Sequence, residues 1–451
     1  MGKYFGTDGF RGEANCELTV DHAFKIGRYI GSFYAKDGHR PQVVIGKDTR
    51  RSSYMFENAL CAGLTSSGAD VYLLHVTTTP SVSYITRIDD FDCGIMITAS
   101  HNSFQDNGIK LINSQGEKME ESVLAGLEAY LDSDEKIPYA YKDKIGYVVD
   151  YSAGRNRYIG YLISIATRSY KKYRIGLDCA NGSSWQMAKS VFDALGADTY
   201  VIGNKPDGLN VNVDCGSTHI EKLQALVKEN HLDAGFAFDG DADRCIAVDE
   251  NGSVVNGDHI IYMCAKFMHD TGKLGNSKAV TTVMSNMGLY KAFDELGIGY
   301  EKTPVGDKYV AENMRENGYL IGGEQSGHVI FGNLSTTGDG IMTAIKIMEV
   351  MTETKEPLSA LAAPVVMYPQ VLKNVVVTDK DETLQCKEVV ETVKKVEEEL
   401  GDEGRVLLRK SGTEPLLRVM AEATSHERCE AAVDEIIAAM NRTGRLVEVK
   451  K

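Results

Sequence analysis

The sequence predicts an α/β protein built from several domains. Three observations indicate this fold class: a length of 451 residues, short apolar runs that each precede a polar loop, and stretches of helical periodicity between the runs. At about 100–200 residues per domain, the length favours three or four domains. Strands that alternate with helices form mostly parallel sheets covered by helices.

The apolar runs indicate strands buried on both faces. In a parallel sheet the polar loop after each run lies beyond the carboxyl end of its strand, where ligands bind. The runs are residues 43–45, 95–97, 175–177, 236–238 and 280–283, and a further strand is expected at 71–74. Helical periodicity predicts helices at 55–68 and 185–195.

The last part of the chain predicts a smaller α+β domain. A strand over 371–378 is followed by a helix over 382–400, and Gly401 is placed to cap that helix. The unit is completed by strands at 406–408 and 416–421 and a helix that runs through Ile436. We therefore expect three mixed α/β domains with mostly parallel sheets and one C-terminal α+β domain around a central active-site cleft, with bounds at 1–153, 154–253, 254–367 and 368–451.

Composition excludes several classes of protein. Apolar residues make up 43% and charged residues 25% of the chain, which excludes disordered, collagen-like and coiled-coil proteins. Acidic residues exceed basic ones by 64 to 49, and a net charge of -15 argues against nucleic acid or an anionic membrane as partner. The nine cysteines are scattered and never spaced as CxxC, which fits a reducing cytoplasm. With no apolar leader and no window of 18 apolar residues, a cytoplasmic protein is expected.

The segment 239–244, DGDADR, carries the sharpest chemical signal. The carboxylates of Asp239, Asp241 and Asp243 repel one another, by roughly 1 kcal/mol per pair in water at about 5 Å. A hard divalent cation such as Mg²⁺ or Ca²⁺ compensates that repulsion with all-oxygen ligands. A solvated acidic turn is the alternative. An EF-hand is excluded, because Arg244 stands where that loop needs glycine and both flanks read as strands.

Ser100 directly follows the predicted strand 95–97, in the segment TASHN. A hydroxyl exposed at that sheet edge can act as a nucleophile or carry a phosphoryl group. A turn that only caps the next element is the alternative. The adjacent His101 can act as a base or hold structure through hydrogen bonds. Since no GxSxG segment is present, a hydrolase triad is not expected.

Three further loops gather groups that suit phosphates and sugars. The segment 409–415, RKSGTEP, with Arg418 beyond it, combines hydroxyls, a glycine and cations, as an oxyanion site requires. The segment 322–328, GGEQSGH, offers hydrogen-bonding groups for sugar hydroxyls. The segment 5–12, FGTDGFRG, is a glycine loop with one charge of each sign. Taken alone, each also fits an ordinary surface loop.

Together, the five loops resemble the α-D-phosphohexomutase superfamily in order and spacing. The resemblance runs along essentially the whole chain and includes 212–219 (NVDCGSTH), 305–310 (VGDKYV) and 336–340 (TTGDG). The CGSTH and VGD segments resemble the branch that acts on glucosamine phosphates. A phosphomannomutase/phosphoglucomutase of the same superfamily is the alternative.

The resemblance implies an isomerase, an intramolecular phosphotransferase that interconverts glucosamine 6-phosphate and glucosamine 1-phosphate for UDP-N-acetylglucosamine synthesis. It implies one Mg²⁺ per subunit and glucosamine 1,6-bisphosphate as intermediate and activator. The partner would be a small sugar phosphate, and a homodimer is allowed. A non-catalytic sugar-phosphate or Ca²⁺-binding protein and a phosphatase with an acidic nucleophile are alternatives from other classes.

The resemblance also implies roles for individual residues. Ser100 would carry the phosphoryl group, Lys110 would transfer a proton and Arg11 would stabilise charge, with His101 as a further catalytic candidate. The metal would bind Ser100, Asp239, Asp241 and Asp243. The substrate would bind Arg244, Lys308, Glu324, Ser326, His328, Arg409, Ser411, Gly412, Thr413 and Arg418. One departure affects this set: Lys308 stands where arginine is usual, and lysine cannot copy a bidentate arginine contact.

Overall fold

The computed structural model describes residues 2–36, 38–411 and 416–450. Its contacts divide the chain into two compact units. The first consists of Met1–Met284 and Leu296–Pro364, and the second of Ser285–Glu295 and Val365–Lys451. Three of the four sheets lie in the first unit and one in the second.

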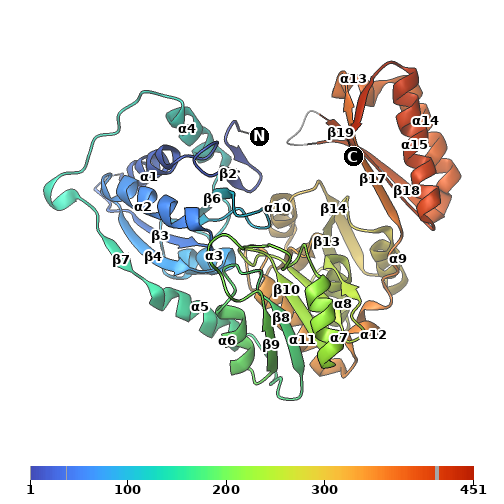
Figure 1. The fold of residues 1–451 in the computed structure, drawn as a ribbon, viewed down its shortest axis with the longest axis horizontal. Helices are drawn as coiled ribbons and strands as arrows, with labels where there is room; N and C mark the ends of the chain where they lie inside the picture. Colours follow the sequence, from blue (N-terminus) through green and yellow to red (C-terminus); the bar gives the residue numbers. More distant parts are fainter. Residues whose placement is uncertain (1, 37, 412–415, 451) are drawn as a thin grey trace. The chain divides into compact units, whose positions relative to one another are not determined.

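The N-terminal sheet has a parallel centre and an antiparallel edge. Its elements are β1 (Phe5–Gly6), β2 (Gly9–Glu13), α1 (Val20–Tyr34), β3 (Gln42–Lys47), α2 (Arg51–Thr65), β4 (Asp70–Val76), α3 (Thr79–Ile88), β5 (Cys93–Ile97), β6 (Asp106–Asn113), α4 (Glu121–Leu131), η1 (Lys142–Lys144) and β7 (Val148–Asp150). The strand order is β1-β2-β6-β5-β3-β4-β7, with β3, β4, β5 and β7 parallel. The core of α1, α2 and α4 includes Val43 and Ile45, whereas α3 packs with Val44 on the other face (Figure 1).

The second sheet carries the acidic segment on a hairpin. Its region contains α5 (Ser152–Ser164), β8 (Arg174–Asp178), α6 (Met187–Ala194), β9 (Asp198–Ile202), α7 (Glu221–Asn230), β10 (Ala234–Phe238), β11 (Cys245–Asp249) and β12 (Val254–Val255). The order is β12-β11-β10-β8-β9, and β10 pairs antiparallel with β11. Because strands flank residues 239–244 on both sides, the exclusion of an EF-hand is confirmed.

The third sheet also presents a hairpin. Its region contains α8 (Gly257–Asp270), β13 (Lys278–Thr282), α9 (Met287–Leu296), β14 (Gly299–Thr303), α10 (Asp307–Asn317), β15 (Ile321–Gly323), β16 (Val329–Phe331), α11 (Gly340–Thr354) and α12 (Leu358–Ala362). The order is β14-β13-β15-β16, and residues 324–328 connect the antiparallel strands β15 and β16. Of the antiparallel strands that extend these sheets, β11 was expected as a flank of the acidic segment, whereas β6, β12 and β16 were not foreseen.

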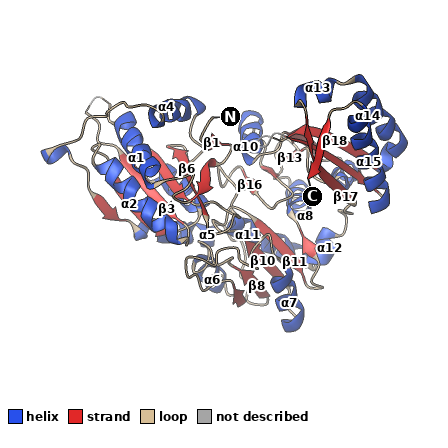
Figure 2. Ribbon diagram, turned by 45° about the horizontal axis from the view of Figure 1, so that its top comes forward, coloured by secondary structure: helices blue, strands red, loops and turns tan. Residues whose placement is uncertain are grey.

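The fourth sheet forms the second unit. Its elements are β17 (Gln370–Val377), α13 (Lys380–Gln385), α14 (Lys387–Leu400), η2 (Gly401–Glu403), β18 (Gly404–Lys410), β19 (Leu416–Ala423), α15 (His426–Arg442) and β20 (Leu446–Lys450). The order is β18-β19-β17-β20, with antiparallel pairing, and α14 and α15 run along one side of the sheet (Figure 2). Two expectations were wrong: the helix over 382–400 breaks at Cys386, which is extended (φ −62°, ψ 122°), and β20 was not predicted.

All nine cysteines are free thiols, and most are buried. Within the described residues, no helix is long and apolar enough to cross a membrane.

Candidate active site

Ser100 follows β5 and is buried, with 1% of its surface exposed. The expectation of an exposed hydroxyl was wrong, because side chains from other segments cover the serine. Its backbone is left-handed (φ 51°), a conformation that costs a non-glycine residue on the order of 1 kcal/mol. Arg50 Nη2 donates to the carbonyl oxygens of Ser100 at 3.1 Å and Asn102 at 2.6 Å. Asn212 Nδ2 donates to the same two oxygens at 2.9 and 3.0 Å, so two donors fix this backbone.

The serine hydroxyl points at the acidic segment. Ser100 Oγ donates to Asp239 Oδ2 at 2.5 Å. The carboxylates of Asp239, Asp241 and Asp243 are buried and offer oxygens that lie within 4.8 Å of one another. A Cβ at Gly240 would meet the Ser100 carbonyl oxygen at 2.5 Å. Glycine at this position therefore lets the two loops approach so closely.

The acidic cluster fits a divalent cation. Among the described residues, Asp241 Oδ1 and Asp243 Oδ1 are buried without a hydrogen-bond partner. Burial, together with Asp243 and Asp241, raises the pKa of Asp239 well above its ordinary value. The other oxygens of Asp241 and Asp243 accept from Lys110, and the two Oδ1 atoms are the kind of ligand that a hard cation such as Mg²⁺ prefers.

Lys110, on β6, lies against this cluster. Its Nζ is 2.8 Å from Asp241 Oδ2, 3.1 Å from Asp243 Oδ2 and 3.1 Å from Asp8 Oδ2. Burial alone would lower the pKa of Lys110, but these carboxylates raise it well above its ordinary value. In this arrangement Lys110 is an ammonium group that offsets negative charge, and its proton-transfer role stays a prediction.

Two arginines leave a buried donor unused. Arg11 forms an ion pair with Asp8, and the backbone N–H of Arg244 donates to Asp239 Oδ1 at 3.2 Å. Within the described part of the chain, the Nε atoms of Arg11 and Arg244 are buried without a hydrogen-bond partner. A buried guanidinium donor without an acceptor is costly, so both arginines suit an anionic ligand such as a phosphoryl group.

His101 is next to the serine but is not protonated near neutral pH. Its Nδ1 is 3.4 Å from Ser100 Oγ. Burial, with Arg244 and Arg11 nearby, lowers the pKa of His101 to about 4. The neutral ring can accept a proton, although its low basicity makes it a weak base.

The sugar-loop candidates line the same region of the first unit. Glu324 Oε1 accepts from the Gly306 amide at 3.1 Å, and burial raises the pKa of Glu324. His328 Nε2 accepts from the Gly338 amide at 3.0 Å. The two observations on His328 oppose each other. Despite burial, Asp243 and Asp307 raise its pKa and favour the protonated ring. The Gly338 bond instead requires Nε2 without a proton, and this bond fits the neutral ring with its proton on Nδ1. Ser326 is exposed.

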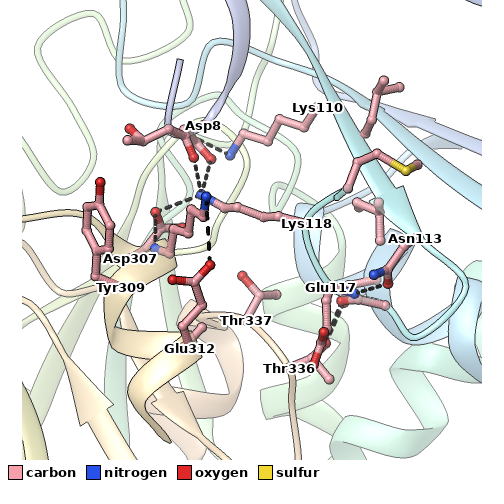
Figure 3. A pocket seen from close by; sticks show the side chains of 18 of the residues that line it. Asp8, Lys110, Asn113, Glu117, Lys118, Asp307, Tyr309, Glu312, Thr336 and Thr337 are labelled. Carbon is pink, nitrogen blue, oxygen red and sulfur yellow. Dashed lines mark hydrogen bonds and ion pairs between the residues drawn. The ribbon is translucent and has the colours of Figure 1, made fainter. Parts of the chain in front are cut away.

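A cavity of about 1240 Å³ borders the site (Figure 3). Its lining includes Asp8, Lys110, Asp243, Lys308 and His328. The ammonium of Lys308 pairs with Glu121 and lies 3.7 Å from Glu312 Oε1. A hexose bisphosphate is well within the size of such a cavity.

The phosphate-loop candidates lie in the second unit. Arg409 on β18 stands directly opposite Arg418 on β19, and like charges in that position are destabilising. Burial and Arg418 lower the pKa of Arg409. An oxyanion between the two strands would relieve this repulsion. Ser411 is buried, and Gly412 and Thr413 lie outside the described residues.

Sequence reasoning missed several residues that shape the site. Asp8 contacts Arg11, Lys110 and Lys118. Because Asp8 and Arg11 carry opposite charges within one short loop, the sequence could have indicated Asp8 as a site residue. Asn212 stood in a segment that resembled the superfamily. Arg50 also pairs with the nearby Asp48, but the contacts by which Arg50 and Lys118 shape the site join residues that are distant in the chain, which no local pattern predicts.

Family models match nearly the whole chain. They describe phosphoglucomutase/phosphomannomutase: alpha/beta/alpha domain I at residues 2–138, domain II at 156–252, domain III at 256–368 and the C-terminal domain at 372–439. The chain belongs to the phosphoglucomutase/phosphomannomutase family. The fold class expected from the sequence and the resemblance to phosphohexomutases are confirmed.

Similar members of this family carry a more specific name. A phosphoglucosamine mutase of Lachnospira eligens is 64% identical over 451 residues, 99% of this chain and 100% of that protein. One of Lachnoclostridium phytofermentans is 60% identical over 447 residues, 99% and 100% of the two chains. Among solved structures, a phosphoglucomutase/phosphomannomutase family protein of Burkholderia thailandensis shares the fold at a TM-score of 0.79, with 23% identity and 98% of each chain covered.

Proposed function

We propose that the protein is a mutase that interconverts glucosamine 6-phosphate and glucosamine 1-phosphate, as a step toward UDP-N-acetylglucosamine. The observation that carries the proposal is the contact of Ser100 Oγ with Asp239 Oδ2, 2.5 Å apart in a buried acidic cluster. The 64% identity to a phosphoglucosamine mutase supports this substrate over the neutral hexose phosphates of the alternative.

In the proposed reaction, the phosphoryl group moves between Ser100 and the sugar. The P–Oγ bond of phosphoserine breaks while a bond forms from phosphorus to the 1-oxygen of glucosamine 6-phosphate, and the proton of that hydroxyl ends on the freed Ser100 Oγ. The resulting 1,6-bisphosphate reorients in the cavity. Its P–O6 bond then breaks as the 6-phosphoryl group returns to Ser100 Oγ, the serine proton passes to the 6-oxygen, and glucosamine 1-phosphate leaves. The residues of this chain supply positive charge: Lys110, Arg11 and Arg244 lie where the transferred group carries its negative charge.

A Mg²⁺ bound by Ser100, Asp239, Asp241 and Asp243 would neutralise charge on the transferred group. Glu324 and His328 are proposed to bind sugar hydroxyls, and His328 lines the cavity. Arg409, Ser411 and Arg418, with Gly412 and Thr413, are proposed to hold the phosphate that does not react. We also propose that the four domains have the bounds expected from the sequence and that the enzyme works in the cytoplasm, where its thiols stay reduced.

The test compares substrates and follows the mass of Ser100. Wild-type protein should turn over glucosamine 6-phosphate faster than mannose 6-phosphate, measured as kcat/KM. After incubation with a hexose 1,6-bisphosphate, peptide mass mapping should place one phosphoryl group on Ser100. Ser100→Ala should lose both properties, whereas Ser103→Ala should keep them. A higher kcat/KM for mannose 6-phosphate would contradict the proposed substrate. An active Ser100→Ala variant would contradict the proposed mechanism.

A further inference from the structure

Lys118 connects two segments that carry site residues. Its Nζ lies 2.8 Å from the carbonyl oxygen of Thr7, 3.2 Å from Asp8 Oδ1 and 2.7 Å from Asp307 Oδ1. Figure 3 shows its ammonium group between the carboxylates of Asp8 and Asp307 at the cavity wall. Asp8 belongs to the loop between β1 and β2, and Asp307 begins α10. Lys118 thus joins the N-terminal sheet to the region of the third sheet.

The charges on both sides of Lys118 continue into the site. Asp8 uses its other oxygen, Oδ2, for Lys110 at 3.1 Å, and Lys110 contacts Asp241 and Asp243. In the other direction, Asp307 follows Gly306, whose amide donates to Glu324 at 3.1 Å. Charges of alternating sign therefore run from Asp307 through Lys118, Asp8 and Lys110 to the acidic cluster, and the neutral Gly306 amide connects Asp307 with Glu324 of the sugar loop.

Lys118 is one of three cations that hold the carboxylate of Asp8. Arg11 lies in the same loop and Lys110 serves three carboxylates at once, and both of them contact Oδ2. Lys118 contacts Oδ1 instead, and it also contacts Asp307, whose neighbour Gly306 donates its amide to Glu324. Lys118 holds Asp8 Oδ1, the oxygen that does not contact Lys110, and so sets the direction in which Asp8 Oδ2 points.

We propose that Lys118 is a positioning residue that holds Asp8 against Lys110 through its bridge to Asp307. It thereby aligns the lysine beside the acidic cluster with the loop that reads the sugar. The inference deepens the proposed mutase function and rests on it. It assigns Lys118 no direct contact with the reacting atoms.

The chain offers a matched control. Arg315 Nη1 pairs with Glu117 Oε2 at 2.6 Å, and so joins the residue next to Lys118 with the same helix α10. This pair crosses between the same two segments, but the Arg315 side chain is 55% exposed and does not contact Asp8 in the described structure. Arg315→Met therefore removes a contact between the segments and leaves the Asp8 contacts in place.

The experiment measures kcat, KM and the thermal midpoint for the full chain and four variants. Lys118→Met, which keeps length and loses charge, should lower kcat about tenfold or more and change KM less than threefold. Lys118→Arg should recover most of kcat. Arg315→Met should match the wild type. Asp307→Asn should also lower kcat. The double variant Lys118→Met/Asp307→Asn should have a kcat no lower than that of the slower single variant, because both substitutions remove the same Lys118–Asp307 ion pair.

Several results would overturn the inference. They are a Lys118→Met kcat within twofold of wild type, equal losses for Lys118→Met and Arg315→Met, or no recovery with Lys118→Arg. If Lys118→Met does not fold, Asp307→Asn alone decides, and a kcat within twofold of wild type counts against the inference.

A crystal structure separates this inference from the proposed function. In Lys118→Met, or in Asp307→Asn if the first variant does not fold, Asp8 Oδ2 should move away from Lys110 Nζ. An unchanged distance near 3.1 Å overturns the positioning role whatever the protein catalyses. If wild-type protein prefers another hexose phosphate, the proposed substrate fails and the variants are measured with that ester instead.

Discussion

Ser100 and Ala242 both have left-handed backbones, with φ of 51° and 56°. Each is a conformation that residues other than glycine and asparagine rarely adopt, and each costs on the order of 1 kcal/mol. Both lie in the two loops whose contact brings the hydroxyl to the carboxylates. Contacts from Arg50 and Asn212 hold Ser100 in this conformation, so the strain persists where the chemistry needs it.

Asp339 predicts a pH dependence of stability. It caps α11 through the Met342 amide at 3.0 Å and accepts from Tyr158, and burial raises its pKa to about 6 from 3.8. The folded chain disfavours the ionised form of Asp339, so ionisation lowers the free energy of unfolding. This loss of stability is absent below about pH 4, grows as pH rises to about 6 and is complete above that pH. A shift of this size corresponds to about 3 kcal/mol.

Asp339→Asn removes this titration while keeping an acceptor for the helix cap. The thermal midpoint of the variant minus that of the wild type should increase between pH 4 and 6 and stay level above pH 7. Tyr158→Phe removes a hydrogen bond that lowers the pKa of Asp339. In this variant the pH range over which stability falls should therefore move to higher pH. A difference independent of pH would contradict the prediction.

Hairpins present the chemical loops of this fold. The acidic segment connects β10 with β11, residues 324–328 connect β15 with β16, and the candidate phosphate loop lies between β18 and β19. Paired strands on both sides hold the ends of each loop at a fixed separation. The two loops that the structure describes in full, 239–244 and 324–328, can therefore be short and still place side chains reproducibly.

The close approach of two loops predicts the effect of Gly240→Ala. The added methyl group would meet the Ser100 carbonyl oxygen, a backbone atom, at 2.5 Å. The loops must separate, so kcat should fall at least tenfold and the thermal midpoint should drop. Gly160→Ala is the control: a Cβ there meets nothing within 4 Å in α5, and alanine should stabilise that helix by up to about 1 kcal/mol. Similar kinetics for both variants would contradict the prediction.

Charge is distributed unevenly in this molecule. The net charge is -15, yet Lys110, Arg11 and Arg244 gather beside one buried acidic cluster, and Arg409 and Arg418 face each other in the second unit. The net charge argues against polyanionic partners, whereas the local clusters suit a sugar phosphate and its cation. The homodimer expected from the resemblance stays a prediction, which light scattering can check.

Metal removal tests the acidic cluster in the whole protein. EDTA should abolish turnover, and added Mg²⁺ should restore it. Because a ligand that binds only the folded state stabilises it, Mg²⁺ should also raise the thermal midpoint of unfolding. Asp241→Asn should remove this rise by deleting a carboxylate with an unpartnered buried oxygen. A rise that survives in Asp241→Asn would place the cation elsewhere.

The sequence by itself determined the α/β class, the acidic segment and the serine, because alternating apolar runs and short motifs are local properties of a chain. It also indicated the loop of Asp8 and Arg11, although not which partners Asp8 takes. Only the tertiary structure decided that Ser100 is buried, that Arg50 and Asn212 fix its carbonyl oxygen, and that Lys118 connects Asp8 with Asp307. These contacts join residues separated by up to 189 positions, and the local hydrophobic pattern of a sequence cannot predict a contact between residues so far apart. A motif specifies which chemical groups are present, because it is a local property of the sequence. The protonation and orientation of those side chains depend on which distant charges the fold brings within about 3 Å.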